Sequence, residues 1–330
     1  MNVMLLAAGE GTRLRPFTNQ LPKPAIPFLN IPLAAHALGF LHDLSIRNLV
    51  VNTYHLPNKI HDLFNRLPHG AEHLIFSDEV GEILGGGGGL MKAKKHFIGG
   101  GDFLLMNADE IILPQDSAIL EKAIAHHKST NAIATLLVMK HHGVGTQFGG
   151  VWTDQKNSIV GFGKTSVPGS SRAWHFVGVQ ILSEKIFNYL PEQGVSNILM
   201  DGIMKALADG KIAQAFPFEC SWFETGNPND FLEATQHCLE ILSGKDSPER
   251  SALQRTLNQF SSTQLIQQNL PGAILYFSKD AQISTNSTYQ GVVCVGAGST
   301  IKDNCDLKNV IIGPGVQVTA GTKAANTMLL

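Results

Sequence analysis

Residues 2–24, NVMLLAAGEGTRLRPFTNQLPKP, place a glycine-punctuated, cationic loop directly after a short apolar run. The run 2–8 has the length and composition of a buried β-strand, and the loop after it carries three basic residues but no acidic residue beyond Glu10. Glycine lacks the Cβ atom that would keep a backbone N–H away from a phosphate. The stretch therefore predicts a strand followed by a phosphate-binding loop.

Two familiar phosphate loops are excluded by their spacing. The dinucleotide fingerprint G-x-G-x-x-G fails because Gly9 and Gly11 are followed by Leu14 at the third glycine position. The Walker A pattern fails at the tripeptide 163–165, GKT, because Ser158 stands where its leading glycine belongs. The loop must belong to another class of phosphate site.

Composition excludes several classes of protein. The chain has 330 residues, 43% hydrophobic and 16% charged, which allows a large core and more than one domain. Its formal net charge of −2 argues against a nucleic-acid-binding surface. The four cysteines lack CxxC spacing, which fits reduced thiols better than a zinc site or a disulfide framework. Without a membrane-spanning stretch or a signal peptide, we expect a soluble, cytoplasmic protein with no membrane or nucleic-acid partner.

Apolar runs alternate with amphipathic segments over the first two-thirds of the chain, as in an α/β protein whose strands are buried on both faces. A helix is expected over Pro32–Leu44, with Asn30 as its cap and Pro32 in its first turn. Strands are predicted at residues 2–8, 48–54, 73–77, 103–107, 132–139 and 176–182.

The C-terminal segment has a different repeat. From about Gln264, apolar residues recur every six positions between Gly, Ser, Asn and Asp, namely Ile283, Tyr289, Val295, Ile301 and Leu307. This period favours a short left-handed β-helix over 264–330, although alternating β-strands imitate part of the pattern. The polar stretch 241–263 is interpreted as a partly helical connector, and 1–240 as the main domain.

The loop after the first strand has the pattern L-A-A-G-x-G-T-R over 6–13, followed by Pro-Lys-Pro at 22–24. This pattern resembles the signature of the sugar-1-phosphate nucleotidylyltransferases, also called nucleotide-sugar pyrophosphorylases. The likeness covers about residues 1–240 and is closest in pattern to muramate-type uridylyltransferases and mannose-1-phosphate guanylyltransferases. Further similar stretches follow in the family's order: KPAIPFLNIPL (23–33), VVNTYHL (50–56), GEILGGGGGLMKA (81–93), FLLMNADEI (103–111) and SWFETGNPNDFLEA (221–234).

The resemblance implies a Rossmann-like, GT-A-like mixed-sheet core and a reaction that needs no protein nucleophile. A sugar 1-phosphate attacks the α-phosphorus of a nucleoside triphosphate, and pyrophosphate leaves. Arg13 is then expected to hold the leaving phosphates and Lys23 the α-phosphate, although an exposed loop lysine is the bland alternative for Lys23. The nucleotide-binding residues implied in this loop are Leu6, Ala7, Ala8, Gly9, Gly11 and Thr12.

The expected cofactor is Mg²⁺, with Asp109 and Glu224 as the implied ligands. Asp109 ends an apolar strand, where ligands of open α/β sheets collect, although a turn cap is the structural alternative. Glu224 replaces the family's usual aspartate, and its extra methylene shifts the carboxylate in a site that demands near-octahedral geometry. Glu110 is expected to point the other way and to be structural. Asn227 is expected to cap a helix that begins at Pro228.

Five consecutive glycines, residues 85–89, resemble the family's glycine-rich nucleoside loop. Gly86 stands where relatives carry threonine, so a hydroxyl contact is missing, while backbone contacts to the base are expected from Gly85, Gly86, Gly87 and Gly88. On the sugar side, the resemblance is weaker and implies Gly149, Lys164 and Gly178. The pairs His126-His127 and His141-His142 are expected to be solvated rather than metal ligands.

Two functions from different classes remain. The first is magnesium-dependent synthesis of a nucleotide sugar from a nucleoside triphosphate and a sugar 1-phosphate. The second is a catalytically weak homologue that binds a nucleotide or nucleotide sugar and regulates a partner, since Gly86, Gly163 and Glu224 depart from the catalytic pattern. Acyltransferase activity is not expected from so short a hexad region, which fits a role in homo-oligomer formation better.

Overall fold

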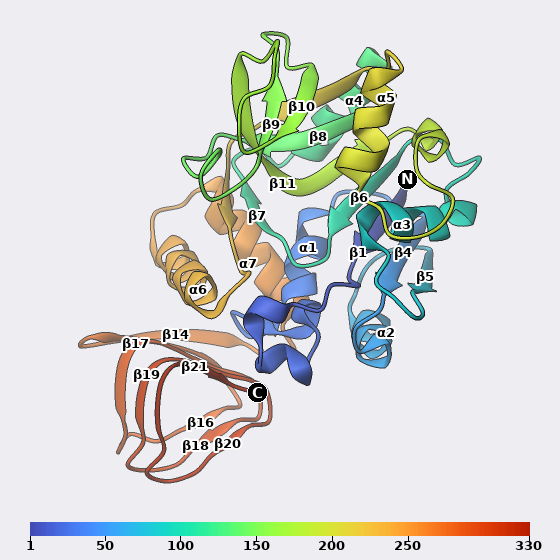
Figure 1. The fold of residues 1–330 in the computed structure, drawn as a ribbon. Helices are drawn as coiled ribbons and strands as arrows, with labels where there is room; N and C mark the ends of the chain where they lie inside the picture. The colour runs from blue at the N-terminus through green and yellow to red at the C-terminus, as the bar shows by residue number, and fades with distance from the viewer.

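The computed structural model describes residues 1–330, and a nine-stranded mixed sheet forms the centre of its N-terminal part (Figure 1). The main strand order is β10-β9-β11-β6-β1-β4-β5, with β8 paired to β11 and β12 paired to β8. Strands β6, β1, β4 and β5 are mutually parallel, while β11 runs antiparallel to β6. The strands of this sheet are β1 (Asn2–Leu6), β4 (Asn48–Thr53), β5 (His73–Asp78), β6 (Phe103–Asn107), β8 (Ala134–Met139), β9 (Gly150–Thr153), β10 (Ile159–Gly163), β11 (Arg172–Leu182) and β12 (Ala213–Pro217).

The predicted α/β class is confirmed, and all six predicted strands are present, β6 with the predicted bounds and the other five with shifted ends. β1 stops at Leu6 rather than Ala8, and β11 begins four residues before the predicted start, at Arg172. The sheet explains the unbroken apolar runs, because successive residues of a strand face opposite sides and both sides are covered. In β1, Val3 and Leu5 belong to one core and Met4 to the other.

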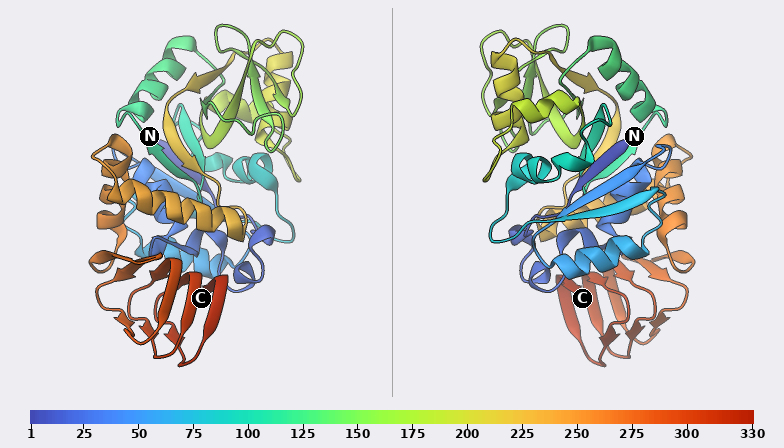
Figure 2. Two further views of the ribbon diagram at one scale, coloured as in Figure 1. Left: turned by 90° about the vertical axis from the view of Figure 1, so that its left-hand side faces the viewer. Right: turned by 90° about the vertical axis from the view of Figure 1, so that its right-hand side faces the viewer.

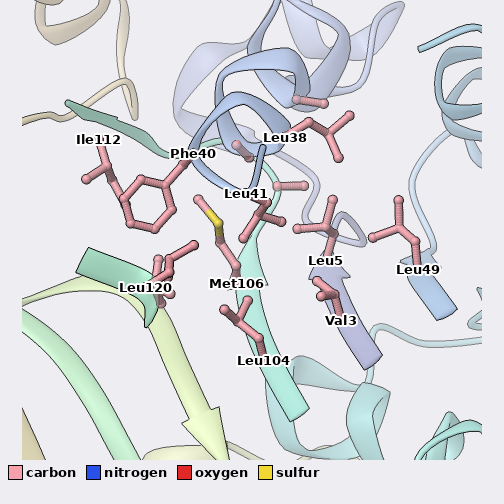
Figure 3. Packing of buried hydrophobic residues seen from close by; sticks show 14 of the residues in the cluster. Val3, Leu5, Leu38, Phe40, Leu41, Leu49, Leu104, Met106, Ile112 and Leu120 are labelled. Atoms are coloured by element: carbon pink, nitrogen blue, oxygen red, sulfur yellow. The ribbon is translucent and has the colours of Figure 1, made fainter. Parts of the chain in front are cut away.

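Helices cover both faces of this sheet (Figure 2). α1, α2 and α4 pack with Val3, Leu5 and Met106 on one face, where Leu38, Phe40 and other apolar side chains fill the space between helix and sheet (Figure 3). α3 and α5 belong to the opposite core. The helices are α1 (Leu33–Phe40), α2 (Pro57–Arg66), α3 (Gly85–Lys92), α4 (Ile119–Thr130), α5 (Met204–Ala208), α6 (Pro228–Ser243) and α7 (Pro248–Phe260). None of them is both long enough and apolar enough to cross a membrane.

The prediction for the first helix is wrong in its boundaries and in its cap. α1 spans Leu33–Phe40 with Pro32 at the N-cap, and no side chain caps it. Asn30 instead lies in a left-handed turn at φ +66°, between β2 (Pro27–Phe28) and β3 (Ile31–Pro32). The Nδ2 group of Asn30 donates to the carbonyl of Val295, 2.9 Å away, and to that of Tyr276. Asn30 therefore ties the N-terminal part to C-terminal strands instead of capping the helix.

The C-terminal strands form two stacks of coiled chain (Figure 1). One stack holds β14 (Leu265–Leu270), β15 (Ala273–Ser278), β17 (Thr288–Val295), β19 (Asp306–Ile312) and β21 (Lys323–Leu329), and the other holds β16 (Gln282–Ile283), β18 (Thr300–Ile301) and β20 (Gln317–Val318). Apart from β14, all these pairs are parallel. Ala273 pairs with Gly291 and Gln282 with Thr300, so the chain returns to the same place after three hexads. This arrangement is compatible with the predicted β-helix.

The C-terminal coil shares an apolar core with the loop after β1. Leu14 and Phe28 belong to the same buried cluster as Phe231 of α6, and Tyr276 and Met328 of the coil complete it. Figure 2 shows α6 and α7 lying between the sheet and the coil. The two remaining strands of the N-terminal part, β7 (Ile111–Pro114) and β13 (Cys220–Phe223), form an antiparallel pair beside α7. The coil thus supports the segment that carries the cationic loop.

Candidate active site

The loop after β1 turns sharply at Gly11, whose φ is +61°. A Cβ atom at this position would lie 2.9 Å from Cγ2 of Thr18 and 3.3 Å from Cβ of Lys23, so the turn requires glycine. The Thr18 hydroxyl donates to the Gly11 carbonyl at 2.9 Å and holds the turn. Gly9 and Thr12 lie exposed on the loop, at the carboxyl end of the sheet's inner strand β1. The predicted phosphate loop is therefore an accessible, tightly folded turn.

Lys23 contacts Asp109. It lies in a single turn of 3₁₀ helix, Lys23–Ala25, and Asp109 follows β6 directly beside the end of β1. The Nζ atom of Lys23 is 2.5 Å from Oδ2 of Asp109, and the two side chains are only 15% and 25% exposed. The structure thus brings a predicted catalytic cation onto a predicted metal ligand.

A second cation–carboxylate pair lies on the same loop. The Nη2 atom of Arg13 is 3.6 Å from Oε1 of Glu224, which follows β13, and Arg13 is 67% exposed. An added Cβ at Gly226 would collide with both the Arg13 guanidinium and the Glu224 carboxylate, so glycine at this position lets the pair form. Asn227 caps α6 as predicted, accepting hydrogen bonds from the backbone N–H groups of Asn229 and Asp230.

Glu110 lies within this group of residues and does not point away from it as the sequence suggested. β6 ends at Asn107, so the alternation of strand side chains no longer applies at position 110. Asn107 donates to Oε1 of Glu110 at 2.7 Å, and the Trp222 indole donates to its Oε2 at 2.8 Å. Burial and, next, the neighbouring Asp109 carboxylate raise the pKa of Glu110 to about 7. Glu110 therefore links the end of β6 to β13, the strand before Glu224.

The glycine run 85–89 is not a loop but most of the helix α3, which corrects the prediction. Glycine disfavours a helix by about 1 kcal/mol per residue, so tertiary packing must stabilise it. The Gly87 N–H donates to the Ser196 carbonyl at 2.9 Å, and the Ser196 N–H donates to the Leu84 carbonyl at 3.0 Å. A Cβ atom at Gly85 or Gly87 would lie 2.7 or 2.6 Å from an oxygen of Ser196. Side chains at these positions would push the helix off its support.

The need for glycine in α3 differs between Gly88 and Gly86. A Cβ atom at Gly88 would lie 2.5 Å from the Gly194 carbonyl oxygen. At Gly86 the nearest atom, Cδ1 of Leu6, is 3.5 Å away, which is ordinary van der Waals contact. The helix therefore has room for a side chain at position 86, where the resemblance implies threonine.

The predicted sugar-side residues separate into two places. Gly178 lies in an irregularity of β11 at φ +78°, and an added Cβ would collide with the Glu110 carboxylate. Gly149 and Lys164 lie exposed at one end of the β9–β10 hairpin. No hydrogen bond or ion pair joins Lys164 to the four charged residues of the two pairs. Of the three, Gly178 is the one whose added Cβ would meet Glu110.

Aromatic rings and histidines line the same side. The His175 and Trp222 ring centroids are 4.2 Å apart, and His141 and Phe148 pack against both. His175 is 5% exposed and both of its ring nitrogens lack a partner. Burial lowers the pKa of His175 to about 4, so the ring is neutral at pH 7.

The expectation of solvated histidine pairs is wrong for His127. It is 1% exposed, and its Nδ1 lies 2.8 Å from the Thr135 hydroxyl, because α4 turns this face onto the sheet. In the other pair, the His141 and His142 rings stack with centroids 4.5 Å apart. No group of three or more histidine, cysteine, aspartate or glutamate side chains is arranged to hold a metal ion.

Comparison with known families then decides the class of the protein. The profile of the nucleotidyl transferase family matches residues 2–241, which hold both cation–carboxylate pairs and the glycine helix. The chain belongs to the nucleotidyl transferase family. The predicted family resemblance is thereby confirmed.

Curated relatives of this nucleotidyl transferase include enzymes acting with different nucleotides and sugars. The UTP–glucose-1-phosphate uridylyltransferase of Synechocystis is 27% identical over 72% of this chain and 63% of its own length. The bifunctional protein GlmU of Methanocaldococcus jannaschii is 29% identical over 74% of this chain and 55% of its own length. The chain thus spans somewhat over half the length of these two relatives. The mannose-1-phosphate guanylyltransferase of Mycobacterium tuberculosis is 24% identical over 97% of this chain and 82% of its own length.

Solved structures support the fold of this nucleotidyl transferase. HddC of Yersinia pseudotuberculosis superposes with a TM-score of 0.58 at 21% identity, over 72% of this chain and 98% of its own. The inositol-1-phosphate CTP transferase of T. maritima gives 0.59 at 19% identity, over 78% and 96% of the two chains. These similarities establish the shared fold of the N-terminal part.

Proposed function

We propose that the chain transfers a nucleoside monophosphate from a nucleoside triphosphate to a sugar 1-phosphate, yielding a nucleotide sugar and pyrophosphate. The observation that carries this proposal is the convergence of two cations from the loop after β1, Arg13 and Lys23, on two carboxylates from separate strands, Glu224 and Asp109. The functions named for the relatives, uridylyl and guanylyl transfer to sugar 1-phosphates, support the same class of reaction.

In this reaction a phosphate oxygen of the sugar 1-phosphate attacks the α-phosphorus in line. A new P–O bond forms to the sugar phosphate, and the bond from the α-phosphorus to the bridging oxygen of the β-phosphate breaks. The protein's tasks are to align two polyanions and to balance their charge. Lys23, held between Pro22 and Pro24, would supply a point charge at the α-phosphate, and Arg13 would hold the β- and γ-phosphates with its planar fork.

Asp109 and Glu224 fit a magnesium ion in their chemistry, since carboxylate oxygens are the ligands that Mg²⁺ prefers. Both keep part of their surface exposed, and each already faces a positive charge. We propose them as the metal ligands. A bound Mg²⁺ would supply neutralising charge to the phosphates. With substrates bound, Lys23 and Arg13 would exchange their carboxylate partners for phosphate oxygens.

The nucleotide would lie between the loop 6–12 and the first turn of α3. Leu6, Ala7, Ala8, Gly9, Gly11 and Thr12 form the proposed phosphate side, and Gly85, Gly86, Gly87 and Gly88 form the proposed nucleoside side. In the first turn of α3, Gly85 and Gly86 are only half-buried, and without a Cβ atom they leave the backbone open to a ligand. Gly87 and Gly88 are buried, and the Gly87 N–H already donates to Ser196, so their part would be to hold the helix in place. The acceptor sugar would lie near Gly178 and the β9–β10 hairpin, which carries Gly149 and Lys164.

The C-terminal coil is proposed to be a left-handed β-helix, with the domain boundaries 1–240, 241–263 and 264–330. Its parallel stacks and the return after three hexads support this assignment. A role in homo-oligomer formation is proposed with it. The supply of nucleoside triphosphates and the four free cysteines favour a cytoplasmic reaction.

The proposal is tested by pyrophosphate release. The full chain is incubated with Mg²⁺, inorganic pyrophosphatase and a matrix of nucleoside triphosphates against sugar 1-phosphates. Release that requires one triphosphate and one sugar 1-phosphate together is the expected result. No release from any pair, together with a rise in melting temperature on adding a nucleotide, would contradict catalysis and favour a nucleotide-binding regulatory protein.

A further inference from the structure

Two buried polar side chains lie beneath the proposed nucleotide site. Asn52 is in β4 and is 2% exposed, and Glu79 follows β5 and is 5% exposed. The two strands are parallel neighbours, with Thr53 paired to Asp78, so the two side chains come from adjacent strand ends. Neither residue was singled out by the sequence, because each is an ordinary polar residue after an apolar run.

The two side chains form a continuous chain of hydrogen bonds. The Ala7 N–H donates to Oδ1 of Asn52 at 2.8 Å, and Nδ2 of Asn52 donates to Oε1 of Glu79 at 2.7 Å. The Leu84 N–H donates to Oε2 of Glu79 at 2.6 Å. Ala7 begins the phosphate loop, and Leu84 is the N-cap residue of α3. These hydrogen bonds therefore connect the two backbone segments that are proposed to bind the nucleotide.

α3 also rests on this pair directly. A Cβ atom at Gly89 would lie 2.7 Å from Oε1 of Glu79 and 2.8 Å from Nδ2 of Asn52. The last glycine of the run is thus required by the contact between helix and pair. A buried hydrogen-bonded carboxylate at a helix start has few alternative geometries, since moving it leaves a donor or the charge unpaired.

We infer that Asn52 and Glu79 are positioning residues that fix the separation between the loop 6–12 and the first turn of α3. This inference rests on the proposed function. A nucleoside triphosphate consists of two halves, a nucleoside and a triphosphate group. It binds more tightly than either half alone only when the loop 6–12 and the first turn of α3 are held at the distance that its covalent structure sets. The pair therefore acts on the joined ligand and not on either half alone.

The test compares the whole nucleotide with its two halves. The nucleoside triphosphate that wild type binds most tightly is chosen from GTP, UTP, dTTP, CTP and ATP. Its dissociation constant, and those of its nucleoside and of inorganic tripolyphosphate, are measured with Mg²⁺ for wild type and Glu79→Gln. Glu79→Gln replaces one acceptor oxygen by an NH₂ group. That group then faces a donor, either Nδ2 of Asn52 or the Leu84 N–H, and one hydrogen bond is lost. We expect about tenfold or greater loss of affinity for the triphosphate, with less than about twofold change for either half.

Two further variants and a control sharpen the test. The double variant Asn52→Asp, Glu79→Gln reverses the polarity of the middle hydrogen bond and keeps all three bonds, so it should restore triphosphate affinity. Gly89→Ala displaces α3 without removing a polar group and should repeat the loss, which keeps the inference testable if Glu79→Gln does not fold. Glu82→Gln, at an exposed carboxylate in the same segment, should bind like wild type.

The outcomes separate the inference from the proposed function. If wild type binds the triphosphate, and Glu79→Gln and Gly89→Ala bind it with unchanged affinity, the inference is overturned and the proposed function is not. Equal losses for the triphosphate and for its halves would also overturn it, since that pattern indicates general damage to the fold. A wild-type chain that binds no nucleoside triphosphate would overturn the proposed function and the inference with it.

Discussion

The proposed nucleotide side and the proposed acceptor side of the site are built in opposite ways. On the nucleotide side, backbone lies against backbone: four of the five glycines in α3 leave no room for a Cβ atom, and buried hydrogen bonds join the segments. On the acceptor side, side chains from distant segments meet, and the buried His175 lacks hydrogen-bond partners. This difference fits the proposed assignment, in which backbone holds the nucleotide and side chains from distant segments meet the acceptor sugar.

The largest expected effect on turnover is at Asp109. Asp109→Asn keeps the side chain's shape but removes the charge that faces Lys23, and with it the proposed metal ligand. Turnover should fall by about 10²–10³-fold, the size of effect seen when one electrostatic contact to a transition state is lost. Pyrophosphate release with the active substrate pair measures it. Asp280→Asn, at an exposed carboxylate of the C-terminal coil, is the control, and equal activity in both variants would remove Asp109 from the site.

The rigidity of the nucleotide side is tested by a matched pair of alanines. Gly88→Ala should lower the free energy of unfolding by about 2–3 kcal/mol, because its Cβ would overlap the Gly194 carbonyl oxygen. Gly86→Ala should raise it by about 0.5–1 kcal/mol, because alanine favours the helix and meets no close atom. Denaturant unfolding measures both. Similar destabilisation by the two substitutions would show that the helix does not rest on the segment 194–198 as described.

The acceptor side makes a prediction about pH. The native pKa of His175 is about 4, below its ordinary value near 6.5, because burial disfavours the charged ring. As pH falls from 6.5 towards 4, the unfolded chain takes up the proton first, so the free energy of unfolding should decrease and then level off. The loss for this one group is at most about 3 kcal/mol.

His175→Phe should remove that contribution from the pH dependence of unfolding, measured between pH 7 and pH 4. His142→Phe, at the exposed neighbour of the same ring cluster, is the matched control. If both variants retain the wild-type slope, His175 is not the residue that makes the acceptor side acid-sensitive.

The smallest expected effect is at the departure from the family pattern. Glu224→Asp introduces the aspartate that the resemblance implies and draws the carboxylate back from the exposed Arg13. Arg13 would then be freer to hold the leaving phosphates. Because an exposed ion pair of this kind contributes less than about 1 kcal/mol, turnover should rise by only about threefold. Steady-state rates at several magnesium concentrations measure it. A fall in turnover would mean that this site is adapted to the longer glutamate.

The sequence predicted the parts of the molecule whose chemistry is local. Unbroken apolar runs marked the six buried strands, and the hexad spacing anticipated the stacked C-terminal coil. Among the strands that were not predicted, β9 and β10 contain glycine and β12 and β13 mix polar with apolar residues, so no unbroken apolar run marks them. The loop after β1 was interpreted as a phosphate-binding loop from its glycines and cations. The structure shows a tight turn with Gly9 and Thr12 exposed, and phosphate binding stays a prediction.

The errors arose where distant segments meet. The glycine run looked like a loop because glycine disfavours helices, whereas packing on residues 194–198 and on the Asn52–Glu79 pair stabilises α3. Glu110 was placed on the wrong side because the strand ends three residues before it. Asn30 was assigned to a cap because its partners, the carbonyls of Tyr276 and Val295, lie far along the chain. None of these partners can be identified from local spacing.

The fate of the α-phosphate tests the central claim most directly. With the active substrate pair, a nucleoside triphosphate carrying radioactive phosphorus in its α-phosphate is converted by wild type and by Asp109→Asn. The account predicts that all transferred label appears in the nucleotide sugar and none in pyrophosphate, at a rate that the substitution lowers sharply. Label released as free nucleoside monophosphate or as pyrophosphate, or transfer that is unaffected by Asp109→Asn, would contradict it.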